Sequence, residues 1–273
     1  MQQEFLKSKI FVLLPDSLLE NEDTLLLKTR KIGFLARIMT IFRIPKVFFY
    51  DDSGSTEDKQ ILANILNYLN APPYLRKYIP RTSNLRNTAI LTPIHSPNHI
   101  GVRYNNIDYV AGMVVESTET GIYVDIGTGS PQKISTSLRF DNRESVIVQS
   151  KNQDVSLVTQ FPPSLYWHTN YEIISRTIED YILEHPDSYV IGASKSGDAV
   201  TYSILKEIQQ HTHPTYLLAC GPLQGSFRAY IKNPDLIDKW INFIPNQGTK
   251  TVKIEEALHS ALSLMNLCSL NLK

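Results

Sequence analysis

The fold of this chain is decided by two stretches, Leu217-Leu-Ala-Cys-Gly-Pro-Leu-Gln-Gly225 and Phe243-Ile-Pro-Asn-Gln-Gly-Thr249. Each follows or contains a short apolar run typical of a buried strand and continues into a loop that contains glycine, and the second loop leads into a helix. Such loops expose main-chain N–H and C=O groups that can hold a small cofactor. Because the two loops lie close together in the sequence, we expect them to form two walls of one pocket.

Strand-like and helix-like patterns alternate in the first and last parts of the chain. The predicted strands are 9–14, 46–50, 188–193, 215–219 and 240–244, and the predicted helices are centred on 25–42, 61–69, 173–182, 200–208 and 257–265. This order is typical of an α/β fold in which helices cover a parallel sheet.

The middle of the chain has a different pattern. Prolines break the helical periodicity before it and close it afterwards at Pro162-Pro163. Short β-rich runs separated by turn residues lie between them, at 109–116, 122–126, 133–138 and 145–149. This spacing predicts a small antiparallel barrel or sandwich. We therefore expect a discontinuous α/β domain, 1–84 with 156–273, interrupted by an inserted β domain, 85–155.

Charge is balanced in total but not in distribution. The 273 residues carry 27 Lys and Arg against 27 Asp and Glu. The segments 24–50 and 59–107 each hold six basic residues and no acidic residue. One face of the protein could therefore be basic and bind nucleic acid, or these side chains could simply be solvated.

Several other functional classes are excluded by chemistry. Gly192–Gly197 has the glycine spacing of a phosphate-binding loop, but Asp198 stands where a lysine is needed. Ser196 occupies the second glycine position of a hydrolase nucleophile elbow. Pro97 denies His95 and His99 the helix that would bring both to one metal, so no metal site is expected.

The remaining composition points to a soluble, cytoplasmic protein. Cys220 and Cys268 are too few for a disulfide framework. No apolar run approaches the roughly 18 residues that cross a membrane. In the second loop, Thr251 is expected to cap the following helix, with Glu255 and Glu256 complementing its dipole.

The residues of the two glycine loops, and the order of the loops along the chain, closely resemble the cofactor loops of the SPOUT (alpha/beta-knot) methyltransferases. The nearest branch is the archaeal and eukaryotic RNA methyltransferases with a small β-barrel inserted in the knot domain. A second motif of that branch is matched by Gly33-Phe-Leu-Ala-Arg37 and Ile41-Phe-Arg43. The chain departs from the branch at His168, after Tyr166-Trp167, and at Ser196, where relatives carry arginine.

The resemblance implies a C-terminal trefoil knot, a homodimer with the pocket near the subunit contact, and an insert of the oligonucleotide-binding (OB) type. It also implies an S-adenosylmethionine-dependent methyltransferase acting on RNA, either ribosomal or transfer RNA. Arg37 is the expected catalytic residue, which would bind the RNA backbone or orient the nucleophile, and Asn246 is the second candidate. The expected cofactor residues are Ala219, Gly221, Pro222, Gly225, Ile244, Gln247, Gly248, Thr249 and Val252, and the expected RNA-binding residues are Arg43, Arg103 and Arg139.

Two alternatives stay open. The Ser196 and His168 departures allow a non-catalytic RNA-binding dimer that keeps the knot as a scaffold. A SPOUT enzyme that methylates a protein side chain is the other possibility, although the inserted barrel and the basic segments favour RNA. The aromatic side chains of the insert, among them Tyr104, Tyr109, Tyr123 and Phe140, suit either base stacking or a hydrophobic core.

Overall fold

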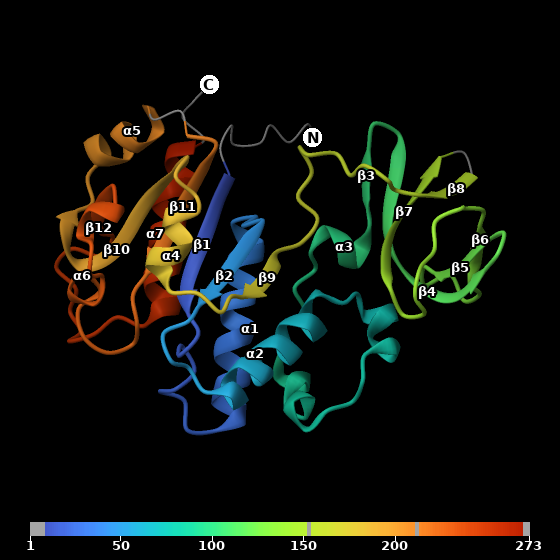
Figure 1. Ribbon diagram of the computed structural model, residues 1–273, viewed down its shortest axis with the longest axis horizontal. Helices are drawn as coiled ribbons and strands as arrows, with labels where there is room; N and C mark the ends of the chain where they lie inside the picture. Colours follow the sequence, from blue (N-terminus) through green and yellow to red (C-terminus); the bar gives the residue numbers. More distant parts are fainter. Residues whose placement is uncertain (1–8, 152–153, 211–212, 270–273) are drawn as a thin grey trace. The chain divides into compact units, whose positions relative to one another are not determined.

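The computed structural model describes residues 9–151, 154–210 and 213–269 (Figure 1). The chain forms two compact units, each assembled from separate segments. The first unit contains the chain up to Leu66, the segment Asn87–Leu91 and the chain from Thr169 onward, and the second contains Asn67–Arg86 and Thr92–His168. The domain borders expected at 84/85 and 155/156 stay predictions.

The first unit is built on a six-stranded sheet in which every pairing is parallel. Its strands, in spatial order, are β12 (Lys239–Asn242), β10 (Ser188–Ala199), β11 (Thr215–Cys220), β1 (Lys9–Pro15), β2 (Lys46–Tyr50) and β9 (Asn170–Ile173). Leu13 of the central strand lies opposite Ala219 on one side and Phe48 on the other. Strands buried on both faces read as continuous apolar runs, which explains the sequence of β1, β2 and β11. The predicted parallel α/β sheet is confirmed.

Helices cover this sheet. The longer ones are α1 (Leu25–Ile41), α2 (Thr56–Asn70), α5 (Tyr202–Gln210) and α7 (Ile254–Ser269), and the shorter ones are α4 (Ile178–Leu183) and α6 (Phe227–Tyr230). The hydroxyl of Thr24 accepts a hydrogen bond from the N–H of Leu27 and caps α1. α7 packs against both α1 and α5, so the chain returns from the edge strand β12 to the helix that follows β1.

Gly33 has a structural role in α1. A Cβ added at this position would overlap the side chain of Leu91, which comes from the short segment Asn87–Leu91 of the same unit. The glycine therefore allows that segment to pack directly on the helix.

The helix predicted over 173–182 is wrong in its first half. Residues Asn170–Ile173 form strand β9, which pairs with β2, and α4 begins only at Ile178. The hydroxyl of Thr177 accepts from the N–H of Asp180 and starts α4 there. The run of isoleucines at helical spacing thus spans a strand, a turn and a helix.

The C-terminal elements differ from expectation in their ends. β12 stops at Asn242 and not at Ile244. β10 continues to Ala199 beyond a bulge: Ala193 and Asp198 both lie opposite Ile241, so Ser194–Gly197 leave the ladder. α7 starts at Ile254, where the N–H of Lys253 donates to the Glu256 carboxylate, so Thr251 is not its cap.

The second unit contains an antiparallel sheet with the order β6-β5-β4-β7-β8, with β3 paired to β4. The strands are β3 (Val102–Tyr104), β4 (Ile107–Thr118), β5 (Gly121–Asp125), β6 (Gln132–Ile134), β7 (Ser145–Lys151) and β8 (Asp154–Leu157). The edge strands β6 and β8 approach each other, which nearly closes the sheet into a barrel around Val114, Ile122 and Val124. The predicted small antiparallel barrel is confirmed, although β3 and β8 were not expected and β6 is shorter than 133–138.

The chain that enters the barrel is attached to it by polar contacts. Residues Pro73–Tyr78 form a 3-10 helix, η1. The Tyr74 hydroxyl donates to the carbonyl of Ala111 at 2.8 Å. The carboxylate of Asp125 accepts from the Tyr78 hydroxyl at 2.8 Å and pairs with Lys77 at 2.6 Å. The short α3 (Pro97–Ile100) belongs to the same unit.

None of the helices among the described residues is long and apolar enough to cross a bilayer.

Candidate active site

The predicted cofactor loops lie at one edge of the parallel sheet. Because β10, β11 and β12 are parallel neighbours, the loops that follow their carboxyl ends share that edge. Two loops meet this description, Gly221–Gly225 after β11 and Phe243–Thr249 after β12. A third segment, the bulge Ser194–Gly197, lies within the carboxyl-terminal half of β10. We call these three segments the loop cluster.

The first loop needs its glycines for two different reasons. A Cβ on Gly221 would overlap the side chain of Phe227, which packs edge-on against Trp240 with ring centroids 5.1 Å apart. Gly221 therefore lets Phe227 join the loop to β12. Gly225 has a φ of 83° and nothing within 4 Å of an added Cβ, so it turns the chain and leaves its main chain open.

The loop after β12 is shaped by its own side chains. The Gln247 amide donates to the carbonyls of Thr249 and Lys250 at 2.9 and 3.2 Å. Asn246 has a φ of 60°, in the left-handed region that asparagine tolerates. Gly248 has nothing within 4 Å of an added Cβ. This loop is therefore self-supported and faces open space at Gly248.

Polar contacts bind the bulge of β10 to the same loop. The Asn242 amide donates to the carbonyl of Lys195 at 3.2 Å, and the Lys195 ammonium donates to the carbonyl of Lys250 at 3.4 Å. Gly197 lies so close to β12 that an added Cβ would be 2.6 Å from the main-chain nitrogen of Ile241. These contacts hold the Ser194–Gly197 segment against β12 and the loop that follows it, so the segment is part of the loop cluster.

All nine expected cofactor residues lie in or beside the loop cluster. Ala219 is fully buried within β11, Ile244 and Val252 are half-buried, and Thr249 is exposed. This mixture of apolar side chains and open main chain resembles the lining of small-molecule sites. Their contact with a cofactor stays a prediction.

Two carboxylates at the same sheet edge were missed by the sequence reasoning. Asp16 follows β1 and Asp52 follows β2. Asp52 accepts from the N–H and the hydroxyl of Ser17 at 2.9 and 2.5 Å. Asp16 is buried, accepts from the N–H of Gly54 at 2.9 Å and pairs with Lys59 at 2.7 Å. The sequence did contain one signal for this pair: each carboxylate comes two residues after the end of a predicted buried strand.

The two carboxyl groups have opposite pKa shifts. Burial and the hydrogen bond with Asp16 raise the pKa of Asp52 to about 6. Burial also acts to raise the pKa of Asp16, but hydrogen bonds from Asp52, Lys59 and Gly54 outweigh it and hold this pKa below its usual value. Asp16 is therefore the ionised member of the pair, and Asp52 takes up the first proton as the pH falls.

Arg37 lies at a different place in the fold. α1 begins near the carboxyl end of β1 and ends before the first residue of β2, and Arg37 is twelve residues after Leu25. That distance is about 18 Å along the helix axis, which takes Arg37 toward the sheet edge opposite the loop cluster. Its side chain is exposed. Arg43 is also exposed, just after the helix, with a φ of 53°.

Comparisons with known proteins bear directly on this arrangement. Residues 9–265 match the model of the family described as "Putative RNA methyltransferase". The chain belongs to this family.

The names of several curated relatives are more specific and state both the RNA and the methylated atom. Proteins of Homo sapiens and Mus musculus named "28S rRNA (uridine-N(3))-methyltransferase" are each 27% identical over 93% of the chain, which covers 77% and 75% of them. The Drosophila melanogaster protein of the same name is 25% identical over 94% of the chain. The chain spans only 62% of the length of that relative.

The expected RNA-binding arginines of this family member's barrel are both exposed. Arg103 on β3 lies 3.8 Å from the Asp108 carboxylate, and Arg139 lies between β6 and β7. Some aromatic side chains of the barrel unit belong to its hydrophobic core, and others keep exposed surface on which a base could stack. Tyr109 is buried and packs on Phe161 with ring centroids 5.5 Å apart. Tyr104 is half-buried, so it retains surface for a ligand.

The sequence departures fall in both units. In the second unit, the main-chain N–H of Asn98 donates to the carbonyl of Trp167, next to His168. In the first unit, Ser196 lies in the β10 bulge, with its N–H and hydroxyl near the Ser194 hydroxyl. Among the residues that the structure describes, no group of three His, Cys, Asp or Glu side chains is arranged to hold a metal.

Proposed function

We propose that this chain is an S-adenosylmethionine-dependent RNA methyltransferase whose cofactor site is the loop cluster. The observation that carries the proposal is the convergence of these three segments at one edge of a parallel sheet in a member of an RNA methyltransferase family. Open main chain at Gly225 and Gly248 suits the carboxylate and the adenine of the cofactor, which need donors and acceptors at close range.

Uridine N3 of ribosomal RNA is the proposed methylation target, by analogy with the names of the curated relatives. Bound S-adenosylmethionine supplies an electrophilic methyl group. Uridine N3 would first give up its proton to solvent, and S-adenosylhomocysteine would be the leaving group when the methyl passes to N3. The contribution of the chain is to hold the reacting nitrogen in line with that methyl and to exclude water during the transfer. Ala219, Ile244 and Val252 would form the apolar side of the site, while Arg37 orients the nucleophile and Asn246 contacts the substrate.

The fold proposed with this function is a SPOUT knot in a homodimer. Support for the knot comes from the path of the chain, which passes from β11 across β10 to β12 and then returns to pack α7 on α1. Support for the dimer comes from an exposed stripe on α1. Leu27, Phe34 and Ile41 are 37%, 49% and 54% exposed and recur every seven residues, with Arg30 and Arg37 between them.

A second copy of the chain would also explain how Arg37 can reach a loop cluster. Because Arg37 lies toward the opposite sheet edge from the loop cluster of its own chain, we propose that it serves the site of the partner subunit. Phe34→Glu should then yield a monomer in sedimentation equilibrium and abolish methyl transfer. The barrel is proposed to be an OB-type RNA-binding module, with Arg43, Arg103 and Arg139 contacting phosphates.

Subunit mixing tests this arrangement directly. Arg37→Ala and Gly248→Arg should each be inactive as homodimers. When the two variants are unfolded and refolded together in equal amounts, half of the dimers should be heterodimers. Each heterodimer has one intact site out of two, so about a quarter of wild-type activity should return. No recovered activity, in a preparation shown to contain heterodimers, would place Arg37 and the cofactor in the same subunit.

The cofactor site is tested by calorimetry with S-adenosylmethionine. We expect a dissociation constant below about 100 μM, or more than about 5.5 kcal/mol, and no binding by Gly248→Arg. This variant should fold, because nothing lies within 4 Å of a Cβ at that position. Transfer of labelled methyl groups to RNA, followed by nucleoside analysis, should give 3-methyluridine. Labelled protein in place of RNA would contradict the proposal, and so would the absence of heat with a folded wild-type dimer.

A further inference from the structure

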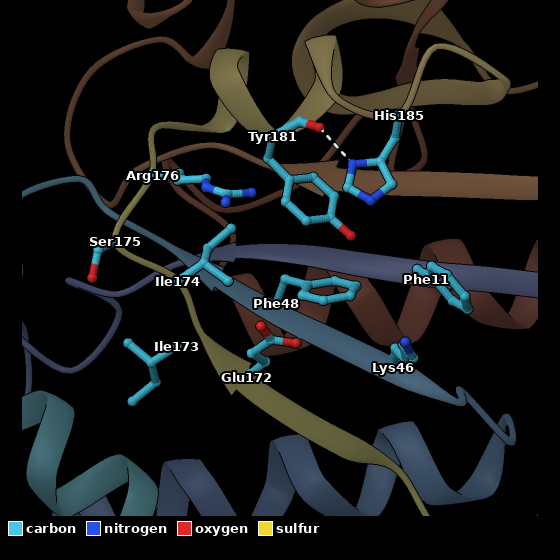
Figure 2. Close-up of a pocket in the computed structure, with 10 residues that line it drawn as sticks. All are labelled: Phe11, Lys46, Phe48, Glu172, Ile173, Ile174, Ser175, Arg176, Tyr181 and His185. Atoms are coloured by element: carbon cyan, nitrogen blue, oxygen red, sulfur yellow. Dashed lines mark hydrogen bonds between the residues drawn. The ribbon is translucent and has the colours of Figure 1, made fainter.

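A hollow of about 520 Å³ lies in the first unit, away from the loop cluster (Figure 2). It opens between α4 and the face of the sheet formed by β1, β2 and β9. Its lining residues are Phe11, Lys46, Phe48, Glu172, Ile173, Ile174, Ser175, Arg176, Tyr181 and His185. None of them belongs to the loop cluster, and the proposed transfer of a methyl group leaves this hollow without a role.

Four rings form a continuous series along the hollow. Phe11 meets Phe48 edge-on at 6.1 Å, Phe48 meets Tyr181 at 4.7 Å, and Tyr181 stacks on His185 at 4.2 Å between centroids. The two inner rings are buried, at 6% and 4% exposure, whereas Phe11 and His185 at the ends are half-buried. The inner rings thus support the outer ones, whose uncovered surfaces can stack on a planar ligand.

The ring series also has defined polar ends. The Nδ1–H of His185 donates to the carbonyl of Tyr181 at 2.8 Å, because a carbonyl can only accept, and Nε2 lies on the side of the ring away from that carbonyl (Figure 2). Burial, and next the charge of Glu172, raise the pKa of the Tyr181 hydroxyl, so it remains a hydrogen-bond donor. The hollow therefore offers a donor and an acceptor beside its rings.

Charges of both signs surround the rings. The Lys46 ammonium lies 5.8 and 5.9 Å from the ring centroids of Phe11 and Phe48. Arg176, which also lines the hollow, is paired with Glu184. Glu172 is exposed on β9, and Figure 2 shows its carboxylate directed toward Phe48. A carboxylate among aromatic rings and cations selects a ligand that brings both N–H donors and a negative group.

We propose that this hollow binds an unstacked guanine of single-stranded RNA, with its Watson–Crick edge on Glu172 and an adjacent phosphate on Lys46. Guanine is the base that presents two neighbouring donors, N1–H and the 2-amino group, to one carboxylate. The other bases place an acceptor beside their donor, which a carboxylate repels. The inference rests on the proposed function for its RNA ligand, and it names a substrate subsite distinct from the loop cluster.

The decisive variant is Glu172→Gln, because the two kinds of binding predict opposite changes in RNA affinity. Specific binding of guanine should become weaker, whereas non-specific binding to a basic surface should become equal or tighter. The probes are a fluorescein-labelled uridine dodecamer with one central guanosine and the same dodecamer with adenosine there, measured by fluorescence anisotropy. The wild-type protein should prefer the guanosine probe about tenfold. Glu172→Gln should weaken guanosine binding about tenfold and abolish the preference. Equal or tighter binding of both probes, as expected when a basic surface loses a negative charge, would overturn the proposal.

Further variants separate the phosphate contact from the rings. Lys46→Ala should weaken both probes and reduce the slope of log affinity against log salt by about one, whereas the control Lys232→Ala, at an exposed lysine on the same unit, should leave that slope unchanged. His185→Ala should weaken both probes about tenfold through lost stacking. Glu57→Gln, an exposed carboxylate on α2, is the matched control for Glu172→Gln and should keep the guanosine preference.

Failure of this inference can be told apart from failure of the proposed function. If the wild-type protein methylates RNA but Glu172→Gln leaves guanosine preference intact, the hollow is not the subsite and the enzyme assignment stands. If no RNA or cofactor is used but Glu172→Gln abolishes guanosine preference, the hollow is confirmed as an RNA site on a non-catalytic protein. If the wild-type protein shows no preference for guanosine, the assignment of the hollow is wrong whatever the enzyme does.

Discussion

The hydroxyl of Tyr50 donates a buried hydrogen bond of 2.8 Å to the carbonyl of Cys220. Tyr50 is the last residue of β2 and Cys220 the last of β11, and the central strand β1 lies between these two strands. Cys220 directly precedes Gly221, where the loop cluster begins. The hydrogen bond therefore fixes the start of a proposed cofactor loop from two strands away.

Tyr50→Phe should remove this bond while keeping the ring. A buried carbonyl left without a donor costs about 1 to 3 kcal/mol of unfolding free energy. Because Cys220 adjoins the loop cluster, we also expect weaker binding of S-adenosylmethionine in calorimetry. The matched control is Tyr216→Phe, whose hydroxyl donates to the carbonyl of Ile208 at 2.9 Å. It should lose similar stability with unchanged cofactor affinity, and an equal loss of affinity in both variants would contradict the local role of Tyr50.

Gly221→Ala should destabilise the first unit through overlap with Phe227. Insertion of a methyl group into a packed contact costs about 1 to 3 kcal/mol, measured by urea unfolding. Gly248→Ala tests the contrast within the same loop cluster, because its Cβ would meet nothing within 4 Å. It should change stability by no more than about 0.5 kcal/mol. A stable Gly221→Ala protein would show that Phe227 can move away without loss.

Gly33→Ala should separate α1 from Leu91, since the new methyl group overlaps that side chain. The overlap costs about 1 to 3 kcal/mol, of which about 1 kcal/mol is offset because alanine is favoured over glycine inside a helix, so we expect a net loss of up to about 2 kcal/mol. Leu91→Ala in the same chain should recover part of it, so the double variant should be more stable than the sum of the single effects predicts. Strict additivity in the double-mutant cycle would mean that the two residues do not touch in solution.

Asp52→Asn should change the dependence of stability on pH. A carboxyl group with a folded pKa near 6 favours its protonated form, so it destabilises the protein progressively as the pH rises from about 4 to about 6. The asparagine variant lacks this decline and should be more stable than wild type at pH 8, by about 1 kcal/mol given partial solvent screening. Equal slopes of unfolding free energy against pH between 4 and 6 would contradict the raised pKa.

Much of the first unit could be predicted from the sequence because its strands are buried on both faces. The runs that became β1, β2 and β11 were located to within a residue of their bounds. The error over 173–182 has a clear physical source. Ile174, Ile178 and Ile182 have helical spacing, but pairing with β2 places the preceding residues Asn170–Ile173 in the sheet. Tertiary pairing overrode local periodicity there.

The candidate site was predicted only where one loop carries its own signal. Gly221 and Gly248 were noticed because glycine after a buried run is informative by itself. The Asp16–Asp52 pair, the bulge held by Lys195 and the hollow beside Glu172 each require residues brought together from distant segments. No spacing in a single sequence records such contacts, so these features emerged from the structure.

The parallel sheet also has a consequence for the order of synthesis. β1 gains its neighbour β2 soon after it is made, but the strand on its other side, β11, begins about 200 residues later. At roughly 5 to 20 residues per second, one side of β1 therefore stays unpaired for about 10 to 40 s during synthesis. During that interval the barrel, whose strands all precede β9, is already complete. A nascent chain of this protein is therefore exposed to misassociation until β11 has been made, at the side of β1 that β11 will cover.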